Sequence, residues 1–126
     1  PEGPHFFPDD IDYNHSEKFI ISEFIREKAI DMTKQEVPYS LAVLVENIQE
    51  GKEGVMVVDA LIYCERDSQK GIIIGKNGSR LKEIGKKSRM DIEYWFGTKV
   101  YLNLYVKVKK EWTKKNYTLK ELGYSL

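Results

Sequence analysis

Disulfides, membrane spans and a net charge are all missing from this sequence of 126 residues. Its single cysteine, Cys64, cannot form an internal disulfide, which favours a reducing compartment over the class of disulfide-stapled secreted domains. No purely apolar run exceeds five residues, whereas a transmembrane helix needs about 20. The chain does not open with a basic segment followed by an apolar one, which would mark a secretory signal. We therefore expect a soluble cytoplasmic protein.

Patterns typical of catalysis and metal binding are also scarce. The two histidines, His5 and His15, have a spacing that fits no metal-ligand pattern. A nucleotide-binding P-loop needs four residues between its glycines and a Ser or Thr after its lysine. Residues 71–77 come nearest, but they have three residues between the glycines, and Asn77 follows the lysine. We expect no enzymatic activity, no metal site and no cofactor in this chain.

The zero net charge conceals a separation of charge along the chain. Residues 1–69 carry 6 Lys/Arg and 15 Asp/Glu, whereas residues 70–126 carry 14 and 5. Charged runs often do no more than solvate an exposed face. A basic half nevertheless favours a polyanionic partner such as nucleic acid, and its boundary falls just before a glycine-containing loop at residues 75–78.

Hydrophobic periodicity predicts a helix and a hairpin in the first half. Residues 17–34 place apolar side chains at helical spacing. The β-branched segments 40–48 and 55–64 predict two strands. Residues 51–54, a first Gly-x-x-Gly sequence, fit the hairpin turn between them, where glycine supplies positive φ.

The second half predicts three helices and the clearest strand. A short helix that ends at Ile74 could use Ser68 as its N-cap. Residues 79–96 have a helical period, and residues 100–109 alternate strictly between apolar and polar, as a strand with one buried face does. Residues 113–122 predict a last helix.

These elements define the fold class and the domain boundaries. A hairpin makes the first two strands antiparallel, and a two-helix crossover makes the second and third parallel. The result is an α+β sandwich of two layers, a three-stranded mixed sheet with helices packed on one face. Residues 1–13 hold three of the four prolines and are expected to be an interdomain linker, so that residues 14–126 form the domain with its C-terminal helix.

The loop Gly75-Lys76-Asn77-Gly78 is the strongest candidate site. Its glycines lack the Cβ atoms that would hold another backbone away, and it directly precedes a helix N-terminus, where unpaired amides and the helix dipole attract phosphate. Basic and apolar side chains surround it: Ile74, Arg80, Leu81 and Lys82. This combination suits single-stranded nucleic acid, and a plain turn between helices is the alternative.

The order helix–strand–strand–helix–GxxG–helix–strand, with Ile-Ile-Ile-Gly-Lys-Asn-Gly-Ser-Arg-Leu at residues 72–81, resembles a type II KH domain. More narrowly, the chain resembles the C-terminal RNA-binding domain of the bacterial Era-like GTPases. Residues 22–28 and 37–40 resemble the first helix and turn of that domain, and residues 102–109 with Trp112, followed by residues 122–124, resemble its last strand and terminus. The resemblance covers essentially the whole chain.

The resemblance implies that this chain is the RNA-binding module of a longer GTPase and lacks the GTPase domain itself. The implied partners are the single-stranded 3′ end of 16S ribosomal RNA, the small ribosomal subunit during maturation, and the protein's own GTPase domain, with the chain as a monomer. The implied location is the bacterial cytoplasm, with peripheral attachment to the inner membrane. The implied RNA-binding residues are Ile73, Ile74, Gly75, Lys76, Asn77, Gly78, Ser79, Arg80, Leu81 and Lys82, to which we add Lys110 and Trp112.

Three aromatic side chains have more than one interpretation, and two alternative functions remain open for the chain. Tyr101 and Tyr105 share the outward face of the last strand, where they either stack bases or simply cover the sheet; we favour the second, since KH domains hold RNA in their groove. Trp112 lies among five lysines and either contacts RNA or packs the last helix. The alternative functions are a KH module of another ribosome- or transcription-associated protein, and a protein-docking domain.

Overall fold

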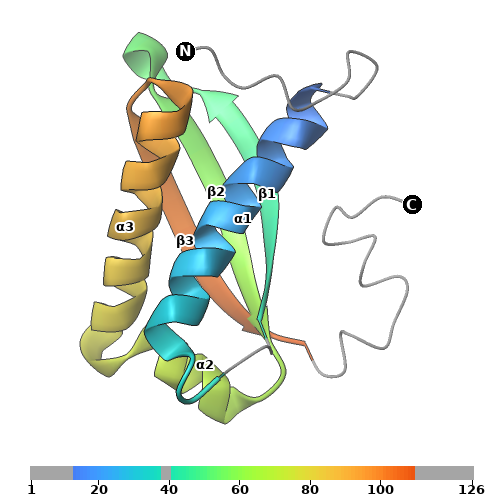
Figure 1. Ribbon diagram of the computed structural model, residues 1–126. Helices are drawn as coiled ribbons and strands as arrows, with labels where there is room; N and C mark the ends of the chain where they lie inside the picture. The colour runs from blue at the N-terminus through green and yellow to red at the C-terminus, as the bar shows by residue number, and fades with distance from the viewer. Residues whose placement is uncertain (1–12, 38–40, 110–126) are drawn as a thin grey trace.

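The computed structural model describes residues 13–37 and 41–109, with side chains from residue 17 onward (Figure 1). In chain order the helices and strands are α1 (Tyr13–Thr33), β1 (Ala42–Glu50), the short 3-10 helix η1 (Lys52–Gly54), β2 (Met56–Cys64), α2 (Asp67–Ile74), the 3-10 helix η2 (Lys76–Gly78), α3 (Ser79–Phe96) and β3 (Val100–Val108). The predicted last helix at 113–122, and the predicted linker except for Tyr13, lie outside these residues.

The three strands form one mixed sheet in the order β1-β2-β3. β1 pairs antiparallel with β2, and β2 pairs parallel with β3. Figure 1 shows the helices together on one face of this sheet, with α3 over the β3 side and α1 over the middle and the β1 side. The predicted α+β two-layer sandwich is confirmed, as are the strand directions and the bounds of the helix at 79–96.

The first Gly-x-x-Gly sequence forms the predicted hairpin turn. Gly51 donates its backbone N–H to the carbonyl of Val55 at 2.7 Å, which closes the turn between β1 and β2. Glu53 and Gly54 both have positive φ, 57° and 78°. This loop connects two antiparallel strands and leads into β2. The second loop leads into a long helix, so the surroundings of the two loops differ.

The predicted N-cap of the short helix is wrong. α2 begins at Asp67, so Ser68 lies inside its first turn. Gln69 takes the capping role: its Oε1 accepts the backbone N–H groups of Glu65 and Arg66, both at 2.9 Å. An N-cap residue must directly precede the helix, and that position is Arg66; Gln69, the third residue of the helix, reaches back to the amides ahead of it.

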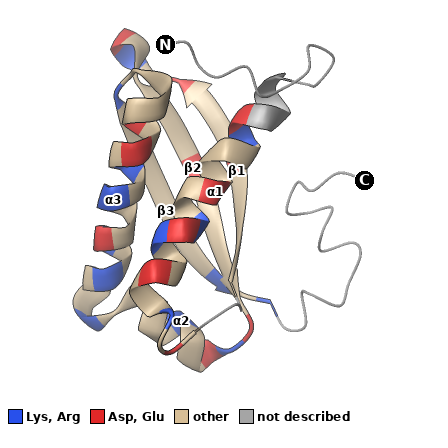
Figure 2. Ribbon diagram, viewed as in Figure 1, with Lys and Arg blue, Asp and Glu red and all other residues tan. Residues whose placement is uncertain are grey.

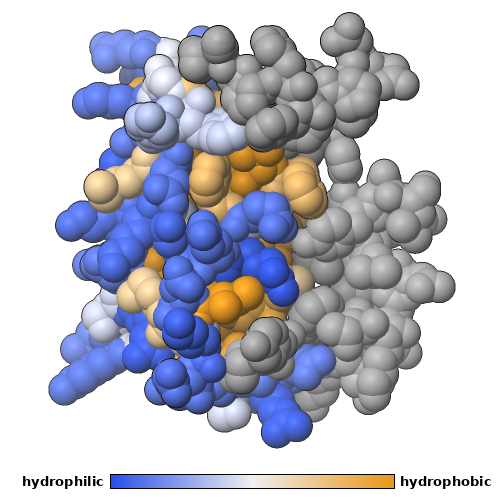
Figure 3. Space-filling model, viewed as in Figure 1, coloured by the Kyte–Doolittle hydropathy of each residue, from blue (hydrophilic) through white to orange (hydrophobic). Residues whose placement is uncertain are grey.

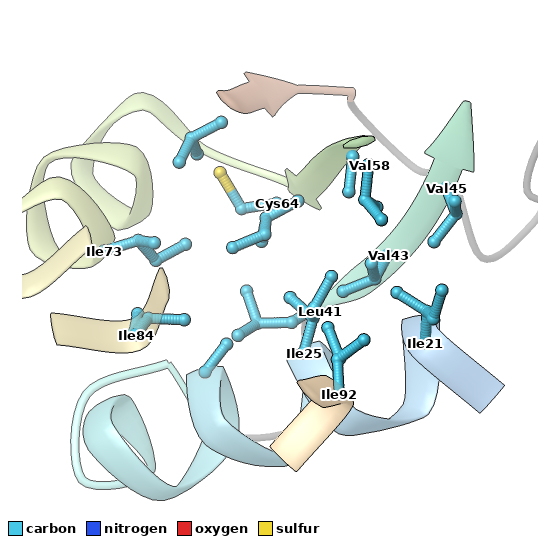
Figure 4. Close-up of a cluster of buried hydrophobic side chains, with 14 of the residues drawn as sticks. Ile21, Ile25, Leu41, Val43, Val45, Val58, Cys64, Ile73, Ile84 and Ile92 are labelled. Atoms are coloured by element: carbon cyan, nitrogen blue, oxygen red, sulfur yellow. The ribbon is translucent and has the colours of Figure 1, made fainter. Parts of the chain in front are cut away.

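The core lies between the sheet and the helices. Figure 4 shows isoleucines from all three helices converging on the valines of β1 and β2, with the Cys64 sulfur at the margin of the cluster. Burial raises the pKa of the Cys64 thiol, which therefore stays protonated and packs as an apolar group. The largest fully buried side chains include Ile21, Ile25, Leu41, Ile62, Ile73, Ile84 and Ile92.

Contacts between α1 and α3 hold the two long helices against each other. The rings of Phe24 and Trp95 meet edge to face at 5.9 Å between centroids. One turn away, Lys28 Nζ lies 2.7 Å from Asp91 Oδ2, and the hydrogen bond to Asp91 raises the pKa of Lys28. A ring pair and an ion pair thus fix the rotation of α3, and with it the direction in which its remaining faces point.

Ser88 offers a test of this helix packing. Its Oγ is buried and, among the side chains that the structure describes, has no hydrogen-bond partner. Replacing Ser88 by Ala removes an unpaired hydroxyl and adds a better helix former, so we expect the free energy of unfolding in urea to rise by about 1 kcal/mol. Ser22→Ala is the matched control, because buried Ser22 Oγ donates to the Phe19 carbonyl at 2.7 Å. A loss of stability in Ser88→Ala equal to that in Ser22→Ala would contradict the prediction.

Candidate nucleic-acid interface

The backbone of residues 75–78 joins α2 to α3 through three positive φ angles. Gly75 has φ 78° and ψ 177°, a region that is almost exclusive to glycine. Asn77 has φ 56° and ψ 28°, and Gly78 has φ 77° and ψ 10°. Asparagine is among the few other residues that tolerate this left-handed conformation. The Gly-Lys-Asn-Gly sequence therefore fits the turn that the backbone makes.

The two glycines are required for different reasons. A Cβ atom on Gly75 would lie 2.7 Å from Arg80 Cβ and 2.9 Å from the Arg80 backbone nitrogen, because the loop folds closely back on the first turn of α3. A Cβ atom on Gly78 would meet no atom within 4 Å. Gly75 is thus demanded by close packing as well as by conformation, and Gly78 by conformation alone.

Alanine substitutions separate these two requirements. We expect Gly75→Ala to lower the free energy of unfolding by about 3 kcal/mol, because strain adds to a clash with backbone. For Gly78→Ala we expect a loss of only about 1 kcal/mol, from the left-handed conformation. Urea unfolding of both variants measures the difference, and equal losses would show that the loop can move away from Arg80.

Around the loop, the predicted site residues are exposed to different degrees. Lys76 and Asn77 are exposed at its tip, and Ser79 and Lys82 are exposed on α3. Ile74 and Leu81 are half-buried. Ile73 is fully buried in the core, so its side chain supports the loop from within and does not face a ligand (Figure 4).

Arg80 is engaged inside the protein. Its Nη1 lies 3.3 Å from Glu36 Oε1 and 3.3 Å from the carbonyl oxygen of Ile72. It therefore links the start of α3 to α2 and to the turn after α1. This arrangement makes Arg80 a support for the loop, in addition to the phosphate-binding role expected from its charge.

A groove with a volume of about 420 Å³ runs from the loop along the space between α3 and β3. The predicted site residues Gly78, Leu81 and Lys82 line its start. The rest of its lining was missed from the sequence: Gly85, Lys86 and Arg89 from α3, and Leu102 and Leu104 from β3. Two predicted residues, Lys110 and Trp112, lie outside the described residues.

The missed residues follow a pattern that the sequence does contain. The missed Lys86 and Arg89 continue from the predicted Lys82 at steps of four and three positions, so the three share one face of α3. Leu102 and Leu104 are alternate residues of the predicted strand and so share its inward face. The sequence does not show that these two faces oppose each other, since that depends on how α3 packs across the sheet.

Charge and apolar surface meet in this groove. Its α3 side carries three cations and its β3 side carries two leucines. Figure 2 shows Lys and Arg recurring along α3, between acidic residues, down to the loop at its start; Figure 3 shows mostly hydrophilic side chains over α3, whereas the apolar patches nearer the middle of this face lie over α1 and outside the groove. Such a groove fits a ligand that has an anionic backbone and flat apolar faces.

At the end of the groove farthest from the loop, Glu93 connects the two walls. Its Oε2 accepts the backbone N–H of Val100 at 2.9 Å and lies 3.2 Å from Arg89 Nη1. The carboxylate therefore ties the last turns of α3 to the first residue of β3, and it holds Arg89 at the groove. Gly85 keeps the middle open: a Cβ atom there would reach within 3.6 Å of Leu104 Cδ1.

Other kinds of site find little support in residues 13–37 and 41–109. No helix in this part of the chain is long and apolar enough to cross a membrane. Nor do three or more His, Cys, Asp or Glu residues gather there in a way that could hold a metal ion.

Comparison with known proteins identifies the family. The family model of the KH domain matches residues 36–113, which is more than half of the chain and includes β1, β2, the loop and both walls of the groove. This chain belongs to the KH domain family. The structure places its Gly-x-x-Gly loop between the two helices of the β2–β3 crossover.

Within that family the chain is similar to Era, which confirms the resemblance seen in the sequence. It is 48% identical over 124 residues to GTPase Era of Staphylococcus haemolyticus and 53% identical over 124 residues to GTPase Era of Trichlorobacter lovleyi. Each alignment covers 98% of this chain and 42% of the relative, so the chain spans less than half the length of these proteins.

Solved structures of Era have the same fold over the whole chain. Aquifex aeolicus Era bound to GDP and AlF4⁻ superposes on this chain with a TM-score of 0.83 at 40% identity. The match covers 100% of this chain and 42% of the Aquifex protein. Era in complex with MgGDPNP and nucleotides 1506–1542 of 16S ribosomal RNA gives the same values.

Proposed function

We propose that this chain binds single-stranded RNA in the groove between α3 and β3, and that the RNA is the 3′ end of 16S ribosomal RNA. The observation that carries the proposal is the groove itself, which starts at the Gly-x-x-Gly loop and has cations on one side and leucines on the other. The similarity to an Era structure that holds a 16S ribosomal RNA segment supports the choice of RNA.

The loop and the groove divide the work of recognition. At the loop, Gly75 and Gly78 let the RNA backbone approach closely, and exposed Lys76 neutralises a phosphate. Bases then lie against Leu81, Leu102 and Leu104 in the groove. The cations of α3 contact phosphates or the acceptor edges of bases. In this arrangement phosphate contacts supply affinity, and the shape and edges of the groove supply base preference.

In the cell, the chain would act as the RNA-binding part of a longer Era-like GTPase during maturation of the small ribosomal subunit. Its coverage of 42% of each Era relative supports this, because the remainder leaves room for a GTPase domain. We place this protein in the bacterial cytoplasm and, peripherally, at the inner membrane, as a monomer whose RNA-binding part needs no cofactor.

Salt dependence tests the electrostatic part of the proposal. Binding of a short RNA with the 3′ sequence of 16S ribosomal RNA should weaken as salt rises, with a slope of log affinity against log salt of about −0.7 for each neutralised phosphate. Fluorescence anisotropy at several salt concentrations, with a scrambled RNA as control, gives slope and preference together. An affinity that is independent of salt would exclude binding through phosphates.

The two Gly-x-x-Gly loops provide an internal control. We expect Lys76→Asp combined with Asn77→Asp to abolish RNA binding, because acidic side chains repel phosphate at the loop tip. The free energy of unfolding should change little, since both side chains are exposed. Lys52→Asp places the same kind of change in the other exposed loop and should leave RNA binding nearly unaltered. If Lys52→Asp weakened binding as much, general charge and not the second loop would be responsible.

A further inference from the structure

The face of β3 that points away from the helices carries an exposed row of aromatic and basic side chains. Leu102 and Leu104 point toward the helices, where they pack against the core and line the groove. Because side chains alternate along a strand, Tyr101, Asn103 and Tyr105 point to the opposite face. Tyr101 is 61% exposed and Tyr105 is 57% exposed.

Lysines stand at both ends of this row. Lys99 precedes Tyr101 by two residues, Lys107 follows Tyr105 by two, and both are exposed. Lys99, which directly precedes β3, and Tyr101, Asn103, Tyr105 and Lys107 of β3 form what we term the β3 outer row. An aromatic surface between cations suits a chain of bases joined by phosphates better than it suits an apolar protein partner.

The middle of the β3 outer row is held in place. Asn103 Nδ2 donates to Asp59 Oδ1 at 2.8 Å on the neighbouring strand, which fixes the amide plane and occupies a carboxylate oxygen beside the row. Leu61, the parallel partner of Tyr105, points to the same outer face and is buried there in a cluster with Ala42 and Tyr63, so the β2 side of Tyr105 is packed. The two tyrosines are about 13 Å apart along the strand, so each ring would meet a different base.

The position of β3 connects this row to the groove. β3 is the edge strand of the sheet beside β2, and Figure 1 shows it along the side that α3 covers. A chain that leaves the groove over this edge needs to pass only one strand to reach the outer row. The β3 wall of the groove and the tyrosines of the row thus lie on opposite faces of one strand.

The sequence favoured Tyr101 and Tyr105 as a mere cover for the sheet; from their exposure between two lysines we infer instead that the β3 outer row is a second RNA-binding surface, on which both rings stack bases of the RNA segment that continues from the groove. This inference rests on the proposed function, because the groove must hold RNA for the same molecule to reach the row. The surface takes single-stranded RNA without strict sequence preference, since stacking is available to every base.

RNAs of two lengths separate the two surfaces. One has about four nucleotides, which the Gly-x-x-Gly groove alone accommodates, and the other has about twelve, within the range of single-strand binding sites. On the complete 126-residue chain, Tyr101→Ala combined with Tyr105→Ala should weaken binding of the longer RNA about tenfold or more and leave the shorter RNA unaffected. The corresponding Phe variants should retain binding, because phenylalanine also stacks.

Tyr94→Ala is the matched control, since Tyr94 is 91% exposed on α3 and lies outside the outer row and the groove lining. It should leave both affinities unchanged. In a second series, Lys99→Gln with Lys107→Gln should reduce the salt slope for the longer RNA by about 1.4 and leave that for the shorter RNA unchanged.

The outcomes distinguish the two proposals. If the unmodified chain binds neither RNA, the proposed function fails. If it binds both RNAs and the tyrosine variants bind the longer one normally, the groove stands and the outer row is not an RNA surface, which leaves protein docking as its use. If the tyrosine variants lose both RNAs equally, the substitutions act through the fold, and the inference is again overturned.

Discussion

Two parallel strands cannot be joined by a short turn, and this constraint determines the arrangement of the site. β2 and β3 lie side by side and run in the same direction, so the chain between them must cross from one end of the sheet to the other. Here the crossing contains two helices, and the chain changes direction between them within the four residues of the Gly75–Gly78 loop. The loop thus exists because the sheet requires it, and its exposed tip is available for binding.

The groove follows from the same crossover. α3 returns along the sheet next to β3, the strand that it leads into, so a helix face and a strand face come to lie opposite each other. Contacts with α1 set the rotation of α3: the Phe24–Trp95 ring pair and the Lys28–Asp91 ion pair engage one side of the helix. The side that carries Lys82, Lys86 and Arg89 is left to face the groove.

The two Gly-x-x-Gly sequences show why a motif acquires meaning only from its place in the fold. Both put positive φ angles at a non-glycine residue, Glu53 in one and Asn77 in the other. Only the second leads into a long helix beside a groove. The sequence allowed this distinction, because strand-like segments flank the first and helical segments flank the second.

Local patterns predicted most of the fold, and features that depend on distant residues were missed. The alternation of apolar and polar residues in β3 and the helical period of α3 were sufficient to predict both elements. Together with the hairpin and the two-helix crossover, they predicted the sheet. The pairing of Arg80 with Glu36, 44 residues away, has no signal in the sequence. The second wall of the groove has no signal in the sequence either. Leu102 and Leu104 look like any inward residues of a strand until α3 is placed above them. The failed Ser68 cap is a smaller case: the helix begins one residue earlier than that cap requires, and Gln69 accepts the amides of Glu65 and Arg66 ahead of it.

The carboxylate of Glu93 has a consequence for the kinetics of binding. It joins α3 to β3 at one end of the groove, while at the other end the tight packing of Gly75 on Arg80 fixes the loop against the first turn of α3. A groove whose walls are tied at one end, and whose loop is fixed at the other, is already close to its bound shape, so little conformational entropy is lost when a ligand enters. For such a preorganised site, differences in affinity among ligands arise mainly from how fast each one leaves, and residence time becomes the quantity that the fold controls.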